Sequence, residues 1–242
     1  MKSGSAPWSA WVPDYELLIF DWDGTLCDSI GRIVDSMRAA ASLDGLGERS
    51  DEAIKGIIGL GLPEAIATLY PELVEVGRVE VFRQRYAERY MALDMRPSPL
   101  FPGVVECLES FRRRGLRMAV ATGKSRRGLD RVLAGHGWLD YFEITRCADE
   151  TASKPDPLML NEILAHCGVP PEKALMVGDS SFDLDMARRV GIDSVAVGYG
   201  AQSLSELLAF APKLAINEFS ELRRWLDGVA NGSLIKEYEN VG

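Results

Sequence analysis

The chain has 242 residues, of which 47% are hydrophobic and 26% charged, the composition of an ordinary folded protein. Its 27 Lys and Arg against 36 Asp and Glu give a net charge of −9, which disfavours nucleic acid and anionic membranes as partners. No apolar run approaches the roughly 18 residues of a membrane span, and the N-terminus lacks the apolar stretch of a secretory signal. We therefore expect a cytoplasmic protein made of one large domain or of a domain with a sizeable insertion.

Short apolar runs alternate with helix-like segments along most of the chain. Strands are expected at 17–20, 117–121, 143–145, 174–177 and 194–197, and helices near 103–114, 126–136, 157–167, 182–190 and 204–210. This alternation predicts an α/β fold, a Rossmann-like parallel sheet whose strands are joined by crossover helices. Ligands of such sheets bind outside the carboxyl ends of the strands.

Residues 28–97 interrupt this alternation with helical periodicity and no convincing strand. We predict an all-helical cap domain there, inserted into a discontinuous core of residues 14–27 and 98–228. A hinge at Pro97-Ser98-Pro99 would return the chain to the sheet. Flexible ends are expected at 1–13 and 229–242, although Trp8 and Trp11 could instead pack on the core or on a partner.

Four aspartates follow two of the predicted strands: Asp21 and Asp23 after the first, Asp179 and Asp183 after 174–177. Each could be a simple turn residue. If the sheet brings them together, however, carboxylates about 5 Å apart repel by ~3 kcal/mol per pair at an effective dielectric near 20. A hard divalent cation with oxygen ligands relieves this repulsion, and Mg²⁺ suits a site that also holds a phosphate oxygen. Asp183 could instead open the next helix and support the site as a hydrogen-bond acceptor.

Other strand ends carry groups suited to phosphate. Thr122 and Gly123 offer a hydroxyl and exposed N–H groups at a helix start, and Lys154 lies in a loop stiffened by Pro155 and Pro157. Each alone is more often a turn or a surface lysine. Their occurrence in order, each at a strand end, favours a phosphate-binding site.

Four motifs together resemble the haloacid dehalogenase-like hydrolases, and within them the phosphoglycolate-phosphatase-like group. They are DWDGTLCDS at 21–29, ATGKS at 121–125, SKPDP at 153–157 and VGDSSFDLDMA at 177–187. The resemblance extends from about Glu16 to Gly198, and the helical insertion is similar to the type-one cap of that family.

The resemblance implies a two-step phosphoryl transfer. Asp21 would be the nucleophile that forms an aspartyl-phosphate, and Asp23 the acid and base that protonates the leaving alcohol and then activates water. Mg²⁺ would be held by the carboxylates of Asp21 and Asp179 and the backbone carbonyl of Asp23, with Asp183 supporting from behind.

The same resemblance assigns Thr122, Gly123 and Lys154 to the transferring phosphoryl group. The expected substrate is a small phosphorylated metabolite, such as phosphoglycolate or a sugar phosphate, and monomer and homodimer both stay open. We expect the specificity to reside in the cap.

Alternative functions are less well supported by the sequence. A sugar-phosphate mutase shares the fold, but the cap turn reads Gly59-Leu60-Gly61-Leu62-Pro63-Glu64, without the arginine that rebinding a bisphosphate commonly uses. A catalytically silent regulatory or binding module is disfavoured because the motif set is complete. A nucleic-acid site at Arg112-Arg113-Arg114 is disfavoured because these cations lie at a helix C-terminus, without interleaved aromatics. Arg126 and Arg127 are expected to face water rather than the phosphate.

Cysteine and histidine chemistry is also disfavoured. The four cysteines form no CxxC pair, and His136 and His166 lie far apart, so neither a zinc site nor a disulfide framework is supported. His166 adjoins Cys167, but adjacent helix positions do not face each other, which favours packing over catalysis.

Overall fold

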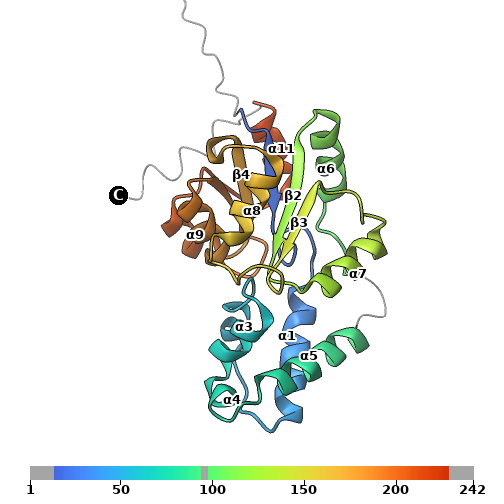
Figure 1. The fold of residues 1–242 in the computed structure, drawn as a ribbon, viewed down its shortest axis with the longest axis vertical. Coiled ribbons are helices and arrows are strands. Elements are labelled where there is room, and N and C mark those ends of the chain that lie inside the picture. Colours follow the sequence, from blue (N-terminus) through green and yellow to red (C-terminus); the bar gives the residue numbers. More distant parts are fainter. Residues whose placement is uncertain (1–13, 94–97, 229–242) are drawn as a thin grey trace, which may run out of the picture.

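The computed structural model describes residues 14–93 and 98–228, and within them the chain forms one parallel sheet covered by helices (Figure 1). The strand order is β3-β2-β1-β4-β5-β6, with every neighbouring pair parallel. The strands are β1 (Leu17–Phe20), β2 (Arg117–Thr122), β3 (Ile144–Cys147), β4 (Ala174–Gly178), β5 (Asp193–Val197) and β6 (Leu214–Ile216). The predicted α/β class is confirmed, and all five expected strands are present.

The central strand β1 buries both of its faces. Leu18 and Phe20 pack in a cluster with α6 (Val104–Arg113), α7 (Arg126–His136) and α11 (Phe219–Leu226). Leu17 and Ile19 pack on the opposite face with α8 (Leu158–Cys167) and α9 (Ser181–Val190). This explains why the first strand is a continuous apolar run rather than an alternating one. The short α10 (Leu204–Leu207) and the 3₁₀ turn Leu208–Phe210 follow β5.

Five helices between β1 and α6 form a separate layer at one end of the sheet (Figure 1). They pack around an apolar cluster of their own, which includes Ile54, Ile66, Tyr70 and Phe82. The helices are α1 (Ile30–Leu43), α2 (Asp51–Lys55), α3 (Leu62–Leu69), α4 (Pro71–Glu75) and α5 (Val79–Leu93). The cap boundaries stay a prediction; residues 94–97, where the hinge was expected to begin, lie outside the described residues, as do Trp8 and Trp11.

The two ends of this helical segment lie side by side. The Asp28 N–H donates to the Pro99 carbonyl at 2.9 Å, and Cys27 forms an isolated antiparallel bridge with Leu100. The chain therefore leaves the sheet layer and re-enters it at neighbouring positions.

Two elements near the end of the described chain were not predicted, β6 and α11. Leu214–Ile216 is three residues long and pairs at the sheet edge through Val195, Ala196 and Val197, so its sequence signal is short.

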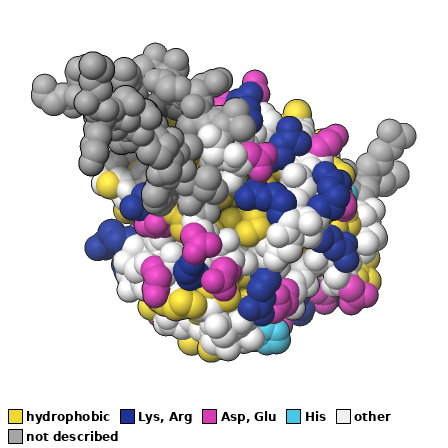
Figure 2. Space-filling view, turned by 90° about the horizontal axis from the view of Figure 1, so that it is seen from above, with side chains coloured by type: hydrophobic (Ala, Val, Ile, Leu, Met, Phe, Trp, Pro, Cys, Tyr) yellow, Lys and Arg dark blue, Asp and Glu magenta, His cyan; other side chains and the backbone are white. Residues whose placement is uncertain are grey.

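On the face seen in Figure 2, basic and acidic side chains are interspersed, with neither sign gathered into a continuous patch on the coloured surface. No helix in the described ranges is long and apolar enough to cross a membrane.

Candidate active site

The register of the sheet brings the sequence motifs to one edge. Phe20 pairs with Val120 on one side and with Val177 on the other. The residues that follow, Asp21 after β1 and Asp179 after β4, therefore emerge at the same level, and Thr122 ends β2 beside them. The expectation that these motifs converge is met in the geometry.

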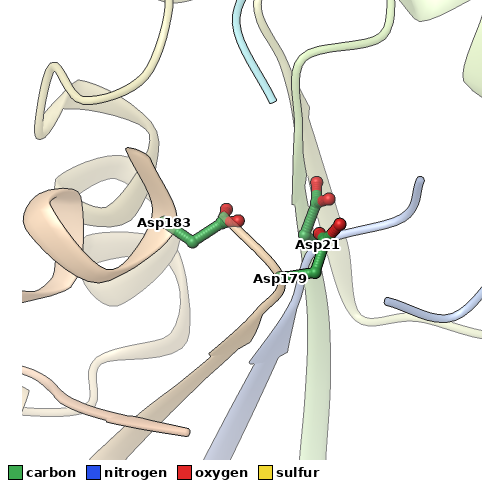
Figure 3. Close-up of side chains that lie close together, drawn as sticks. All are labelled: Asp21, Asp179 and Asp183. Atoms are coloured by element: carbon green, nitrogen blue, oxygen red, sulfur yellow. The ribbon is translucent and has the colours of Figure 1, made fainter. Parts of the chain in front are cut away.

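Asp21, Asp179 and Asp183 form an acidic cluster, in which one carboxylate oxygen from each residue lies within 4.8 Å of one from each of the others. Asp21 and Asp179 stand next to each other at their strand ends, and Asp183 reaches toward them from α9 (Figure 3). All three side chains are buried. Three carboxylates in a buried space this small need positive charge nearby.

Lys154 supplies one such charge. Its Nζ donates to Asp21 Oδ1 at 2.7 Å and to Asp183 Oδ1 at 2.6 Å, and the lysine side chain is itself fully buried. Burial alone would lower the pKa of Lys154, but the carboxylates of Asp183 and Asp21 outweigh it and raise the pKa. Lys154 is therefore a fixed ammonium directed into the acidic cluster.

Asp183 has both of its oxygens engaged. Oδ1 accepts from Lys154, while Oδ2 accepts from the Ser180 hydroxyl at 2.7 Å and from the Ser180 N–H at 3.2 Å. Ser180 and Asp183 thereby form the capping box that begins α9. This arrangement fits a residue that holds Lys154 in place from behind the site.

The residues present fit a divalent metal. The three carboxylates of the acidic cluster carry three negative charges when ionised, and the Lys154 ammonium that is hydrogen-bonded to Asp21 and Asp183 balances one of them. Burial raises the pKa of Asp21 to about 7, since it outweighs the attraction of Lys154, and burial followed by the charges of Asp21 and Asp183 raises the pKa of Asp179. A dication bound by these carboxylates would offset both the burial of their charges and their mutual repulsion. The all-oxygen donor set is the one that hard cations prefer.

Asp179 is held in a fixed orientation. Its Oδ1 accepts from the Thr25 hydroxyl at 3.0 Å and its Oδ2 from the Ala201 N–H at 2.7 Å. A Cβ at Gly24 or Gly200 would lie 2.0 or 2.3 Å from Asp179 Oδ2, so only glycine fits at these positions.

Asp23 is held by a second cation that the sequence reasoning missed. Lys124 Nζ lies 2.8 and 2.9 Å from the two oxygens of Asp23, and the Ser29 hydroxyl donates to Oδ1 at 2.5 Å. The same Nζ lies 3.4 Å from the Tyr90 hydroxyl of α5, so Lys124 connects the predicted acid-base residue to the helical layer. The available signal was its place inside the ATGKS motif, one residue beyond Gly123.

Thr122 and Gly123 lie where the two layers meet. Thr122 is fully buried at the end of β2, and its hydroxyl accepts from the Lys124 N–H at 3.2 Å. A Cβ on Gly123 would lie 2.4 Å from the Leu60 carbonyl oxygen and 2.6 Å from that of Gly59. The Gly61 N–H also donates to the Ser153 hydroxyl at 2.8 Å, so the turn 59–61 is seated against the predicted phosphate-binding loops.

Of the two arginines that were expected to face water, Arg127 is exposed and Arg126 is only partly exposed. Arg126 donates to Glu150 Oε2 at 2.8 Å and to Asp130 Oδ1 at 3.0 Å, which ties the start of α7 to the loop after β3. Arg127 is exposed but lines the site cavity. Arg126 and Arg127 are adjacent in the helix and lie on different sides of it, so Arg126 forms the ion pairs and Arg127 does not share them.

A cavity of about 800 Å³ lies between the two layers and includes Asp21 and Asp23 in its lining. Lys124 and Gly123 contribute from the sheet side, and Tyr90 contributes from α5. Asp21 of the acidic cluster thus faces a space able to receive a substrate.

A parallel α/β sheet with a carboxylate at the end of its central strand, an ammonium beside it and a helical layer over the cavity defines a class of hydrolytic enzyme. The family model for haloacid dehalogenase-like hydrolases matches residues 18–197. The chain belongs to this family.

Individual relatives agree with this placement. The probable phosphatase IndB of Dickeya dadantii is 33% identical over 209 residues, covering 85% of this chain and 91% of its own. The phosphoglycolate phosphatase of Nitrosococcus oceani is 29% identical, covering 89% and 98%. The crystal structure of a Bacteroides fragilis protein assigned to the haloacid dehalogenase-like hydrolases superposes with a TM-score of 0.78 at 28% identity, covering 86% and 99%.

Proposed function

We propose that the protein is a phosphatase that hydrolyses a phosphate monoester through an aspartyl-phosphate on Asp21. The observation that carries this proposal is the unequal environment of the two Asp21 oxygens. Oδ1 is bound by Lys154, whereas Oδ2 is buried without a partner in the described residues. An oxygen that is desolvated and unbonded, in a side chain otherwise held in place, has the properties of a nucleophile.

In the first step, Asp21 Oδ2 forms a bond to phosphorus and the ester P–O bond breaks. The departing alcohol oxygen takes a proton from Asp23, whose carboxyl group is positioned by Lys124 and Ser29. In the second step, Asp23 accepts a proton from water, the water oxygen bonds to phosphorus, and the Asp21 carboxylate is restored. The sum is monoester plus water giving alcohol plus inorganic phosphate.

Lys154, Thr122 and the N–H groups around Gly123 would bind the phosphoryl oxygens. Lys154 already lies 2.7 Å from Asp21 Oδ1, so its charge is close to where the transferring group would be attached. Fixed donors of this kind stabilise the charge that develops on phosphoryl oxygens in the transition state.

Mg²⁺ is the proposed cofactor. Asp21 and Asp179, with the backbone carbonyl of Asp23, would hold it, while Asp183 would act through Lys154. Bound there, it would neutralise phosphoryl charge as a Lewis acid. The all-oxygen donor set supports a hard dication over Zn²⁺, whose sites favour nitrogen and sulfur ligands.

A mutase is disfavoured, since the cap turn at 59–64 contains no arginine. A catalytically silent module is disfavoured because all the predicted catalytic side chains are assembled. The proposed location is the cytoplasm, which agrees with four cysteines that are buried and unpaired.

The test is phosphate release from para-nitrophenyl phosphate and from a panel of metabolite monoesters, with Mg²⁺ and with EDTA. Turnover is expected only when Mg²⁺ is present, and Asp21→Asn should abolish it. Asp35→Asn, at an exposed aspartate of α1 outside the cavity, is the matched control and should behave like the wild type. Wild-type turnover in Asp21→Asn would refute the nucleophile assignment.

A further inference from the structure

The site cavity is larger than the expected small substrates require. Its volume of about 800 Å³ lies in the upper part of the roughly 300–1,000 Å³ range of pockets that enclose drug-sized ligands. A two-carbon phosphate ester would fill the end beside Asp21 and leave most of this space to water. The remaining walls therefore indicate what the rest of the substrate is.

The wall formed by the helical layer is mainly apolar. Ile33 and Met37 from α1 line it, together with Ile57 and Ile58 from the connection after α2, and all four are nearly or fully buried. Tyr86 of α5 also lines the cavity, and burial raises its pKa. The four aliphatic side chains have no strong hydrogen-bonding group to offer a sugar hydroxyl.

Charge on the helical-layer wall is scarce and partly neutralised. Among the described residues, that layer contributes one cation, Arg83, and one acid, Glu64, to the lining. Arg83 is bound by both oxygens of Glu80, each at 2.6 Å. On the sheet side the lining contributed by the described residues contains three cations, Lys124, Arg127 and Arg131, and one further acid, Asp149, besides Asp21 and Asp23. The cavity thus has a charged side at the sheet and an apolar end at the helical layer.

We propose that the substrate is a phosphate monoester whose alcohol part is a bulky, mainly apolar group that lies against Ile33, Met37 and Tyr86. This proposal rests on the proposed phosphatase function and specifies its substrate class. Apolar surface that faces a water-filled cavity gains about 25 cal/mol per Å² when a ligand removes it from water. The phosphoryl group at Asp21 fixes one end of the substrate, and the length of the cavity beyond it accommodates the other.

The test uses primary alkyl phosphates, because ethyl, butyl and hexyl phosphate share one leaving-group chemistry and differ in apolar length alone. We expect kcat/KM to rise about fourfold for each methylene that becomes buried, and therefore more than 50-fold from ethyl to hexyl phosphate. Phenylethyl phosphate tests a ring as the apolar group, and phosphoglycolate tests a small anionic one. A flat series, or a preference for phosphoglycolate over hexyl phosphate, would overturn the proposal.

A pair of variants on α5 locates the effect. Ala87 lines the cavity, whereas Ala92 is exposed on the same helix and does not line it. Ala87→Phe fills the apolar end, so the hexyl-to-ethyl ratio of kcat/KM should fall at least tenfold. Ala92→Phe should leave the ratio unchanged. Equal ratios in the two variants would place the alkyl group elsewhere and contradict the proposal.

A binding measurement separates this proposal from the proposed function. Calorimetric affinity of Asp21→Asn for ethyl and hexyl phosphate needs no turnover, and hexyl phosphate should bind more tightly by the same factor per methylene. Hydrolysis of ethyl phosphate without any gain from chain length would refute the apolar group and leave the phosphatase standing. Chain-length-dependent binding without hydrolysis of any ester by the wild type would refute the phosphatase and retain the apolar site.

Discussion

Replacing Lys154 with methionine should strongly destabilise the metal-free protein. The ammonium lies 2.7 Å from Asp21 Oδ1 and 2.6 Å from Asp183 Oδ1, and all three side chains are at most 2% exposed. Methionine has a similar length and no charge, so the variant removes the cation and keeps most of the volume. The carboxylates would then share the buried cluster without a counter-charge.

The magnitude follows from the two distances. At an effective dielectric of 20, each pair at these separations attracts by ~6 kcal/mol, and desolvation of the three ions offsets a large part of this. Breaking a buried ion pair by removing one partner costs about 3–5 kcal/mol. With two carboxylates left unpaired, we expect a loss in this range in the free energy of unfolding at pH 8.

The pH dependence makes the reasoning testable. Protonation of the unpaired carboxylates relieves their repulsion, so the loss caused by Lys154→Met should shrink at pH 5. The assay is urea unfolding in EDTA at both pH values. Lys173→Met is the control, because Lys173 is partly exposed and pairs with Asp14 at the surface, where little or no loss in the free energy of unfolding is expected. A loss below 1 kcal/mol at pH 8 for Lys154→Met, or one independent of pH, would refute the reasoning.

Three further predictions concern the metal, the acid-base residue and the contact between the layers. The pKa of Asp21 is raised to about 7, so the folded metal-free protein binds more protons than the unfolded chain between about pH 4 and 7. Its unfolding free energy should therefore fall as pH rises through this range. Mg²⁺ should raise the Tm more at pH 8 than at pH 5, and an equal rise at the two pH values would contradict the assignment of the metal site to these carboxylates. Lys124→Met removes the cation that holds both Asp23 oxygens and should lower kcat about 10²-fold in steady-state assays with Mg²⁺; a change below threefold would exclude a positioning role. Gly123→Ala places a Cβ 2.4 Å from the Leu60 carbonyl oxygen and should therefore reduce kcat/KM. In the control Gly31→Ala the new Cβ has nothing within 4 Å, so activity should be kept and urea unfolding should show a gain of about 0.5–1 kcal/mol in stability. Equal activity of the two glycine variants would show that the contact is dispensable.

The residues of the acidic cluster could be predicted because strand ends leave a clear signature. Asp21 and Asp179 each follow a compact apolar run, and parallel pairing of those runs requires that their ends meet. The family resemblance then distinguished a metal site from a set of turns.

Other features depend on contacts that sequence patterns do not carry. Lys124 lies two residues beyond Thr122, the last residue of β2. Its contacts with Asp23 and Tyr90 nevertheless depend on how the helical layer is placed over the sheet. The apolar end of the cavity was also hidden, since Ile33 and Met37 show the same helical spacing as ordinary core residues. The strand Leu214–Ile216 was missed because three apolar residues at a sheet edge give too short a pattern.

The hydrogen bond between the Asp28 N–H and the Pro99 carbonyl has a consequence for how such proteins diversify. The two ends of the helical segment are held together by this hydrogen bond. For the sheet layer, the segment is therefore equivalent to a loop whose ends are already joined. Its length and internal packing can then change with little effect on the folding of the sheet, since lengthening a closed loop adds little entropy cost. Mutations in the helices can thereby reshape the cavity wall without altering the strand ends that carry Asp21 and Asp179.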